Sequence, residues 1–187
     1  MNQVEISYEE LEQEFLKALA DLGSEDFGSE RGVVATSQDG HVTARRMRLL
    51  SDGFTLYGWT HSYTRKVEQI RTNPNVSVVV EYIQIDGVAS VKGNPTDEPK
   101  FLEIFRKKLP HRYDNMVKRW KTLGDRNVIK IIPKRIAIMK YADPEARIEQ
   151  GLYMLNVDER KAYRFGGQVF YANHNDAPAY WNTPSFL

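Results

Sequence analysis

The amino-acid sequence predicts a mainly β protein with peripheral helices, in which six or seven antiparallel strands close into a barrel. Short runs rich in β-branched and aromatic residues are separated by tight turn signals, and helical periodicity is confined to the N-terminus and two inner segments. Strands joined by tight turns pair antiparallel, and closing such a sheet removes its exposed edges. We therefore expect one domain over residues 1–187, with its core at about 28–141.

The first predicted element is an amphipathic N-terminal helix over residues 7–22. Ser7-Tyr8-Glu9-Glu10 has the form of a capping box, in which the serine hydroxyl accepts from the backbone of the first turn. Behind it, apolar residues recur at helical spacing until Gly23: Leu11, Phe15, Ala18, Leu19 and Leu22.

A three-stranded meander is predicted next, over residues 33–37, 42–50 and 54–59, because Asp-Gly turn signals separate these runs. A short helix with Val67 and Ile70 on one side follows, and Asn73-Pro74 ends it.

The second half of the core is predicted to begin with a strand over 76–82 that is apolar on both faces, followed by a turn at Asp86-Gly87 and a strand over 88–93. A helical pair begins at Pro99 and continues over about 112–123. Further predicted elements are strands over 127–132 and 135–141, separated by Pro133, and a hairpin of 152–157 and 162–165 within a C-terminal extension, 142–187.

Composition excludes several classes of protein. With 26 Lys and Arg against 25 Asp and Glu, the net charge of +1 gives no global field for nucleic acid or an anionic membrane. There is no cysteine, so disulfides, thiolate nucleophiles and cysteine-based metal sites are excluded. The polar N-terminus and the lack of a long apolar run predict a cytoplasmic protein.

Other motifs give weak or negative signals. The four histidines show no metal-ligand spacing, so we expect no metal site, and we expect His61 to be a solvent-facing loop residue. A basic stretch over 106–121 could suggest RNA binding, but its cations fall on the solvated side of the helices. No serine-hydrolase, P-loop or dinucleotide-binding motif is present.

Positive charge and hydroxyls gather in two neighbouring segments. Arg45, Arg46, Met47 and Arg48 lie in a predicted strand, where alternation places Arg46 and Arg48 on one face and Arg45 and Met47 on the other. The second segment, residues 56–66, runs from a strand into the start of the short helix and ends in Thr64-Arg65-Lys66. Free backbone N–H groups, hydroxyls and cations at a helix start favour a phosphate.

These residues resemble the pyridoxamine 5′-phosphate oxidase-like family of flavin mononucleotide (FMN)-binding split barrels. The resemblance covers about residues 32–93 well and extends more loosely to about 141. It rests on the Arg-Met-Arg-Leu-Leu strand, on Thr60-x-x-x-Thr64-Arg65-Lys66 and on the segment 67–78 that follows.

The resemblance implies an FMN-dependent oxidoreductase that works as a homodimer, with FMN at the subunit interface and a small-molecule substrate. Arg46, Thr64, Arg65 and Lys66 would then hold the phosphate, and backbone near Met47, Arg48, Trp59 and Thr60 would lie along the flavin ring. Arg45 or Arg48 could stabilise the reduced ring. No side-chain nucleophile is predicted, and the catalytic residues stay unknown.

The sequence also departs from authentic pyridoxamine 5′-phosphate oxidases. A glutamine of those enzymes is replaced by Val88, and their C-terminal Trp and Arg-x-His signature is missing, so we expect a different substrate. Two alternatives stay open: a non-catalytic flavin-binding or stress-associated protein, and a split barrel that binds haem or a deazaflavin. In the tail, Tyr171, Tyr180 or Trp181 could wall the substrate pocket, or the segment could strap the barrel's outer surface.

Overall fold

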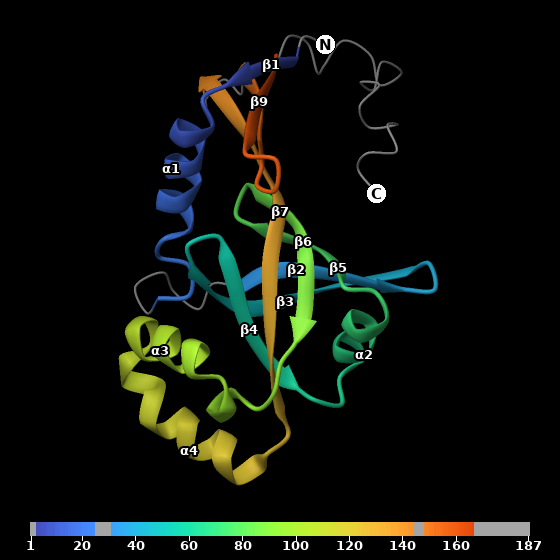
Figure 1. The fold of residues 1–187 in the computed structure, drawn as a ribbon, viewed down its shortest axis with the longest axis vertical. Coiled ribbons are helices and arrows are strands. Elements are labelled where there is room, and N and C mark those ends of the chain that lie inside the picture. The colour runs from blue at the N-terminus through green and yellow to red at the C-terminus, as the bar shows by residue number, and fades with distance from the viewer. Residues whose placement is uncertain (1–2, 25–30, 144–147, 167–187) are drawn as a thin grey trace.

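The computed structural model describes residues 3–24, 31–143 and 148–166. Tyr171, Tyr180 and Trp181 lie outside these ranges, so the expectations for the tail are not tested. The described elements, in chain order (Figure 1), are β1 (Gln3–Ile6), α1 (Tyr8–Leu19), β2 (Arg31–Gln38), β3 (His41–Asp52), β4 (Thr55–His61), α2 (Arg65–Thr72), β5 (Asn75–Val80), β6 (Ile83–Val91), η1 (Pro95–Asp97), α3 (Pro99–Lys108), η2 (Pro110–Arg112), α4 (Tyr113–Leu123), β7 (Arg126–Asp143), β8 (Ile148–Asn156) and β9 (Lys161–Gly166).

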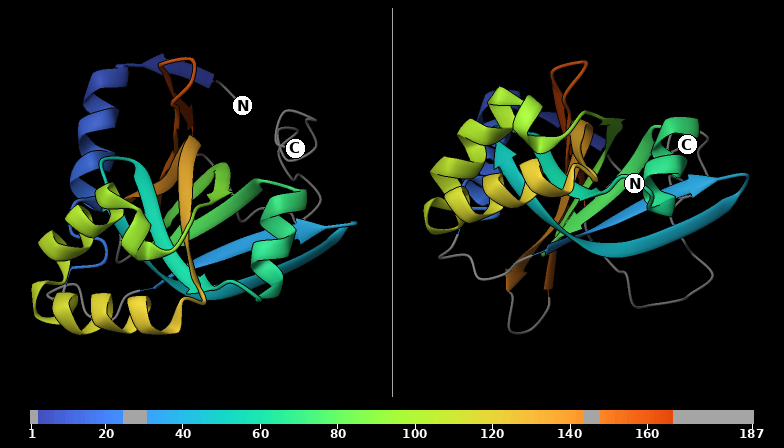
Figure 2. Two further views of the ribbon diagram at one scale, coloured as in Figure 1. Left: turned by 60° about the horizontal axis from the view of Figure 1, so that its bottom comes forward. Right: turned by 90° about the horizontal axis from the view of Figure 1, so that it is seen from below.

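The strands form one antiparallel sheet that closes on itself. Its order is β1-β9-β8-β7-β4-β3-β2-β5-β6, and an additional pairing of β6 with β7 closes a circuit of six strands. The other three strands continue the sheet from the second half of β7, at the top of Figure 1. Figure 2 shows α2 and the α3–α4 pair on different sides of the barrel. The predicted antiparallel barrel is confirmed.

β7 is one strand of 18 residues, so the prediction of two strands broken at Pro133 is wrong. Residues 126–131 pair with β4, and pairing with β8 begins at Arg135. Pro133 lies between these two pairings, where no neighbour on that side requires its missing N–H group. On the other side, it lies opposite an irregularity of β6. A proline is therefore tolerated without ending the strand.

The predicted turn at Asp86-Gly87 is also wrong. β5 ends at Val80, and the chain turns at Glu81, whose φ is +52°, and Tyr82. Gly87 instead lies inside β6 at a shift of register, where a Cβ would be 2.6 Å from the carbonyl oxygen of Ile132. The glycine allows β6 and β7 to approach at a bulge, which is the other common use of glycine in a strand.

The predicted N-terminal helix is confirmed as α1. The backbone N–H of Glu10 donates to Ser7 Oγ (3.3 Å), as the capping box requires. At the other end, Lys108 Nζ from α3 donates to the carbonyl oxygens of Ala20 (2.6 Å) and Leu22 (2.9 Å). A cation at this end satisfies carbonyl groups that have no partner within the helix.

Two apolar clusters hold the fold together. The larger fills the barrel and extends beneath α1, and the smaller lies between the barrel wall and the α3–α4 pair. The smaller cluster is built largely from aromatic rings: Tyr57, Trp59, Phe101, Phe105 and Trp120. None of the helices within the described ranges is long and apolar enough to cross a membrane.

Candidate functional site

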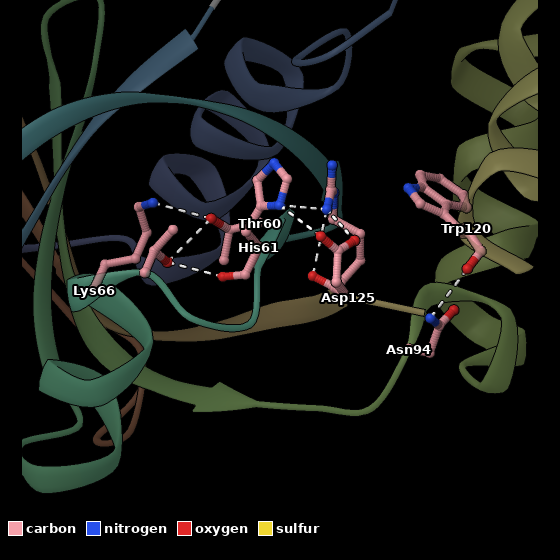
Figure 3. A network of polar contacts seen from close by, with 8 residues as sticks. Thr60, His61, Lys66, Asn94, Trp120 and Asp125 are labelled. Atoms are coloured by element: carbon pink, nitrogen blue, oxygen red, sulfur yellow. Dashed lines mark hydrogen bonds and ion pairs between the residues drawn. The ribbon is translucent and has the colours of Figure 1, made fainter. Parts of the chain in front are cut away.

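A cation and two hydroxyls meet where β4 ends and α2 begins. Lys66 Nζ donates to Thr60 Oγ1 (3.0 Å), and the hydroxyls of Thr60 and Thr64 are 3.4 Å apart. Figure 3 shows Lys66 reaching toward Thr60. Thr64 precedes α2, but its hydroxyl donates to the carbonyl oxygen of His61 (2.9 Å) and does not cap the helix. No side chain of the described residues therefore caps α2, and no such capping bond occupies the backbone N–H groups of its first turn.

Arg45 lies under α2, on the inner face of β3. Its guanidinium donates to the carbonyl oxygen of Val34 (3.1 Å), to Thr36 Oγ1 (2.7 Å) and to the hydroxyl of Thr43. It also donates to Gln69 Oε1 (3.3 Å), which accepts from Thr36 (2.7 Å) and Thr43 (3.0 Å) as well. All of these acceptors are neutral, so the charge of Arg45 is solvated but not compensated.

The charge on this cluster is unbalanced. Burial lowers the pKa of Arg45 below its ordinary value, and the nearby charge of Arg65 lowers it further. Burial also lowers the pKa of Lys66, and the charge of Arg45 adds to this effect. Among the described residues, no carboxylate forms an ion pair with these three side chains. Three cations that share a partly desolvated site favour a bound anion.

The other predicted residues of β3 divide between its two faces. Arg46 is exposed on the face opposite Arg45, while Met47 is buried and Arg48 is half-buried. Arg46 is in register with Val33, which in turn is in register with Val79, and these valines are 37% and 43% exposed. The structure thus brings Arg45 and Lys66 together and leaves Arg46 on an outer apolar surface.

The side chain of Trp59 lies among aromatic rings. Its ring centroid is 5.4 Å from that of Phe105 and 5.9 Å from that of Trp120, both in edge-to-face geometry. Trp59 and Thr60 are neighbours in β4, so their side chains point to opposite faces, one toward α3–α4 and the other toward α2. Only the backbone is shared by both sides of this strand end.

Two features of the site were not predicted. His61 is the last residue of β4 and not a loop residue; its side chain is 40% exposed, and its Nδ1 lies 3.0 Å from Asp125 Oδ2. Arg126 contacts both partners. Burial opposes the charge of Asp125, but the His61 hydrogen bond and the Arg126 charge outweigh it and lower the pKa of Asp125. The pairing of His61 with Arg126 in adjacent strands creates this group.

Gln69 is the second unpredicted feature. It is 1% exposed and lies between the buried residues Val67 and Ile70 of α2. A polar side chain on the buried face of a helix requires hydrogen-bond partners, and this was the available signal in the sequence.

Within the described part of the chain, no three metal-ligating side chains come together.

Comparisons with known proteins agree with this fold. Residues 16–140 match the family model described as pyridoxamine 5′-phosphate oxidase. General stress protein 26 of Bacillus subtilis is 30% identical over an alignment of 92 residues, and the match covers 44% of this chain and 64% of that protein. The chain therefore matches less than two thirds of the length of this curated relative.

Two solved structures are similar. General stress protein 26 of Bacillus anthracis is 25% identical, with 65% of this chain and 91% of that chain covered and a TM-score of 0.49. A pyridoxamine 5′-phosphate oxidase-related, FMN-binding protein of Nostoc punctiforme is 12% identical, with 83% and 96% covered and a TM-score of 0.58, a likeness of fold. The family model covers more than half of the chain, and so the chain belongs to the pyridoxamine 5′-phosphate oxidase family.

Proposed function

We propose that this protein binds FMN and uses it as an oxidoreductase on a small molecule. The observation that carries the proposal is the cluster of Arg45, Arg65 and Lys66 at the start of α2, where the described residues supply cations and hydroxyls but no carboxylate. A phosphate monoester supplies the missing negative charge and accepts from Lys66, from Arg65 and from the first backbone N–H groups of α2. Thr64 would join these donors by turning its hydroxyl from the carbonyl oxygen of His61.

The residues of the cluster have different roles in this proposal. Lys66 and Arg65 carry the charge that binds the phosphate, and Thr60 orients the Lys66 ammonium through its hydrogen bond. Arg45 is a positioning residue, because its hydrogen bonds to Gln69 and to β2 fix α2 on the barrel. The flavin ring would lie along backbone groups of Met47, Arg48, Trp59 and Thr60. When bound, FMN supplies hydride or electron transfer.

The outer face of the barrel supports a homodimer. Val33, Val79 and Arg46 lie in one row across β3, β2 and β5, and both valines expose more than a third of their surface. A second copy would cover this apolar surface, and the flavin would lie between subunits, where Arg46 could also reach the phosphate. Val79→Glu should then convert the dimer, about twice the 21.6 kDa chain mass in sedimentation, into monomers.

Titration with FMN tests the phosphate site. Lys66→Met should lower the affinity by about ten- to a hundred-fold, because one charge-assisted hydrogen bond to the phosphate is lost. Lys118→Met removes an exposed cation of α4 and should leave the affinity unchanged. Equal affinity in Lys66→Met and the wild type would refute the site. Arg46→Met then decides whether the outer face contributes to it.

A second function is favoured by the relative named a general stress protein: a flavin-binding protein without turnover. Oxidation of a reduced nicotinamide cofactor by the FMN-loaded protein, with an added electron acceptor, distinguishes the two functions. The visible absorption spectrum of the purified protein distinguishes flavin from haem and from a deazaflavin.

A further inference from the structure

A pocket lies beside the end of β4, between this strand and α4. It has a volume of about 300 Å³, is open to solvent, and is lined by the end of β4, the start of β7 and α4. Its lining includes Trp59, His61, Arg119, Trp120 and Arg126. Because it lies against α4, we call it the α4 pocket.

One residue of the pocket lining, Trp120, carries a buried donor without an acceptor among the described residues. Trp120 is 1% exposed, and its indole Nε1 has no hydrogen-bond partner among the described residues. Buried donors are almost always paired in native proteins, so an unpaired one indicates a missing acceptor. Figure 3 shows the indole nitrogen of Trp120 turned toward the side on which His61 lies.

The direction of this donor is fixed by packing. The Trp120 ring meets Phe105 edge-to-face at 4.9 Å and lies 5.7 Å from Phe101 and 5.9 Å from Trp59. The ring cannot turn its N–H group to another partner without disrupting these contacts. The N–H group of Trp120 therefore keeps one fixed direction.

The pocket is also positively charged. Arg119 is exposed on α4, and no hydrogen bond or ion pair joins it to the other described residues. Arg126 is 9% exposed and contacts Asp125 and His61 through Nη1, which leaves its Nη2 and Nε without a partner in the described part of the chain. Asp125 balances only one of these charges.

We propose that the α4 pocket binds the oxyanion of a small molecule, a carboxylate or a phosphate ester. The oxyanion accepts a hydrogen bond from Trp120 Nε1 and faces the guanidinium groups of Arg119 and Arg126. The pocket borders Trp59 and Thr60, so the bound molecule would lie beside the flavin as its substrate. Only this last role rests on the proposed function; binding of the oxyanion does not.

The test follows the indole N–H signals of the ¹⁵N-labelled, flavin-free full chain during titration with inorganic phosphate or with benzoate. Trp120→Phe identifies the Trp120 signal by removing it. This signal should move downfield and saturate with at least one anion, and the anion that binds decides between a phosphate ester and a carboxylate. Arg119→Gln should weaken that binding about tenfold, the expected loss of one charged partner.

Two controls make the test specific. Lys118→Gln removes the neighbouring exposed cation of α4 and should leave the affinity unchanged. Lys66→Met removes the proposed FMN phosphate site and should also leave it unchanged, so failure to bind FMN does not affect this test. The proposal is overturned if the Trp120 signal moves with neither anion, or if its movement requires Lys66 but not Arg119.

Discussion

The two sides of the barrel that helices cover are stabilised in different ways. The α3–α4 pair covers an aromatic cluster whose members pack against one another through apolar contacts. The indole N–H of Trp120 is a polar group within this cluster that has no partner among the described residues. α2 buries Val67 and Ile70 in the larger cluster, but it also covers a polar group. In this group Thr36, Thr43 and Arg45 all donate to the single amide oxygen of Gln69. The first side gains its stability almost wholly from buried apolar area, whereas the second also holds uncompensated charge.

This difference shows where stability and ligand binding are separated. Apolar contact is favourable without any ligand, so the α3–α4 side stabilises the free protein. Burial, together with the nearby charge of Arg45, lowers the pKa of Lys66, so the charged α2 side is less favourable until an anion binds. Substitutions on the two sides should therefore change different measured quantities.

The largest expected effect is on the aromatic side. Phe105 is fully buried and contacts Trp59, Phe101 and Trp120. Phe105→Ala should lower the free energy of unfolding by about 3–5 kcal/mol, because the deleted ring leaves a cavity. Urea denaturation measures this change. A loss under about 1 kcal/mol would show that the cluster does not stabilise the barrel.

A smaller loss is expected on the polar side. Gln69→Leu keeps the size of the side chain but leaves the Thr36 and Thr43 hydroxyls without their acceptor, so the free energy of unfolding should fall by about 2–3 kcal/mol. Gln84→Leu makes the same change at an exposed position of β6 and should alter stability by less than about 0.5 kcal/mol. Equal stability of the two variants would mean that the Gln69 hydrogen bonds add nothing.

Local patterns predicted the aromatic side but not the contacts between distant strands. Phe101 and Phe105 recur at helical spacing, and so their burial follows from the sequence alone. Asp86-Gly87 has the local signature of a turn, but contact with β7 across the barrel makes it a bulge. Nothing within a few residues of this pair indicates that contact.

The candidate site shows the same limit. Strand alternation predicted that Arg45 and Arg46 face opposite sides, but not which side is inside, because this depends on how β3 lies in the closed sheet. Likewise, His61 and Asp125 are 64 residues apart, and only the register of β4 with β7 brings them together. Spacing along the chain predicts residue faces, and sheet closure decides which of them meet.

The smallest expected effect is a pH dependence that only the α2 side should show. In the free protein, burial and the charge of Arg45 place the pKa of Lys66 below its ordinary value of 10.5. A bound phosphate dianion favours the ammonium form, so the pKa should be higher in the FMN complex. Between these two pKa values the complex holds more protons than the free protein, and the affinity must fall as pH rises through that range.

Lys66→Arg isolates this contribution, because a guanidinium stays charged across the range. FMN affinity, measured by fluorescence titration from neutral pH upward, should fall more steeply in the wild type than in Lys66→Arg, because only the lysine loses its charge within this range. Titration of the flavin itself is common to both proteins and cancels in the ratio of their affinities. Parallel curves would mean that Lys66 does not touch the phosphate and that the uncompensated charge at α2 serves another ligand.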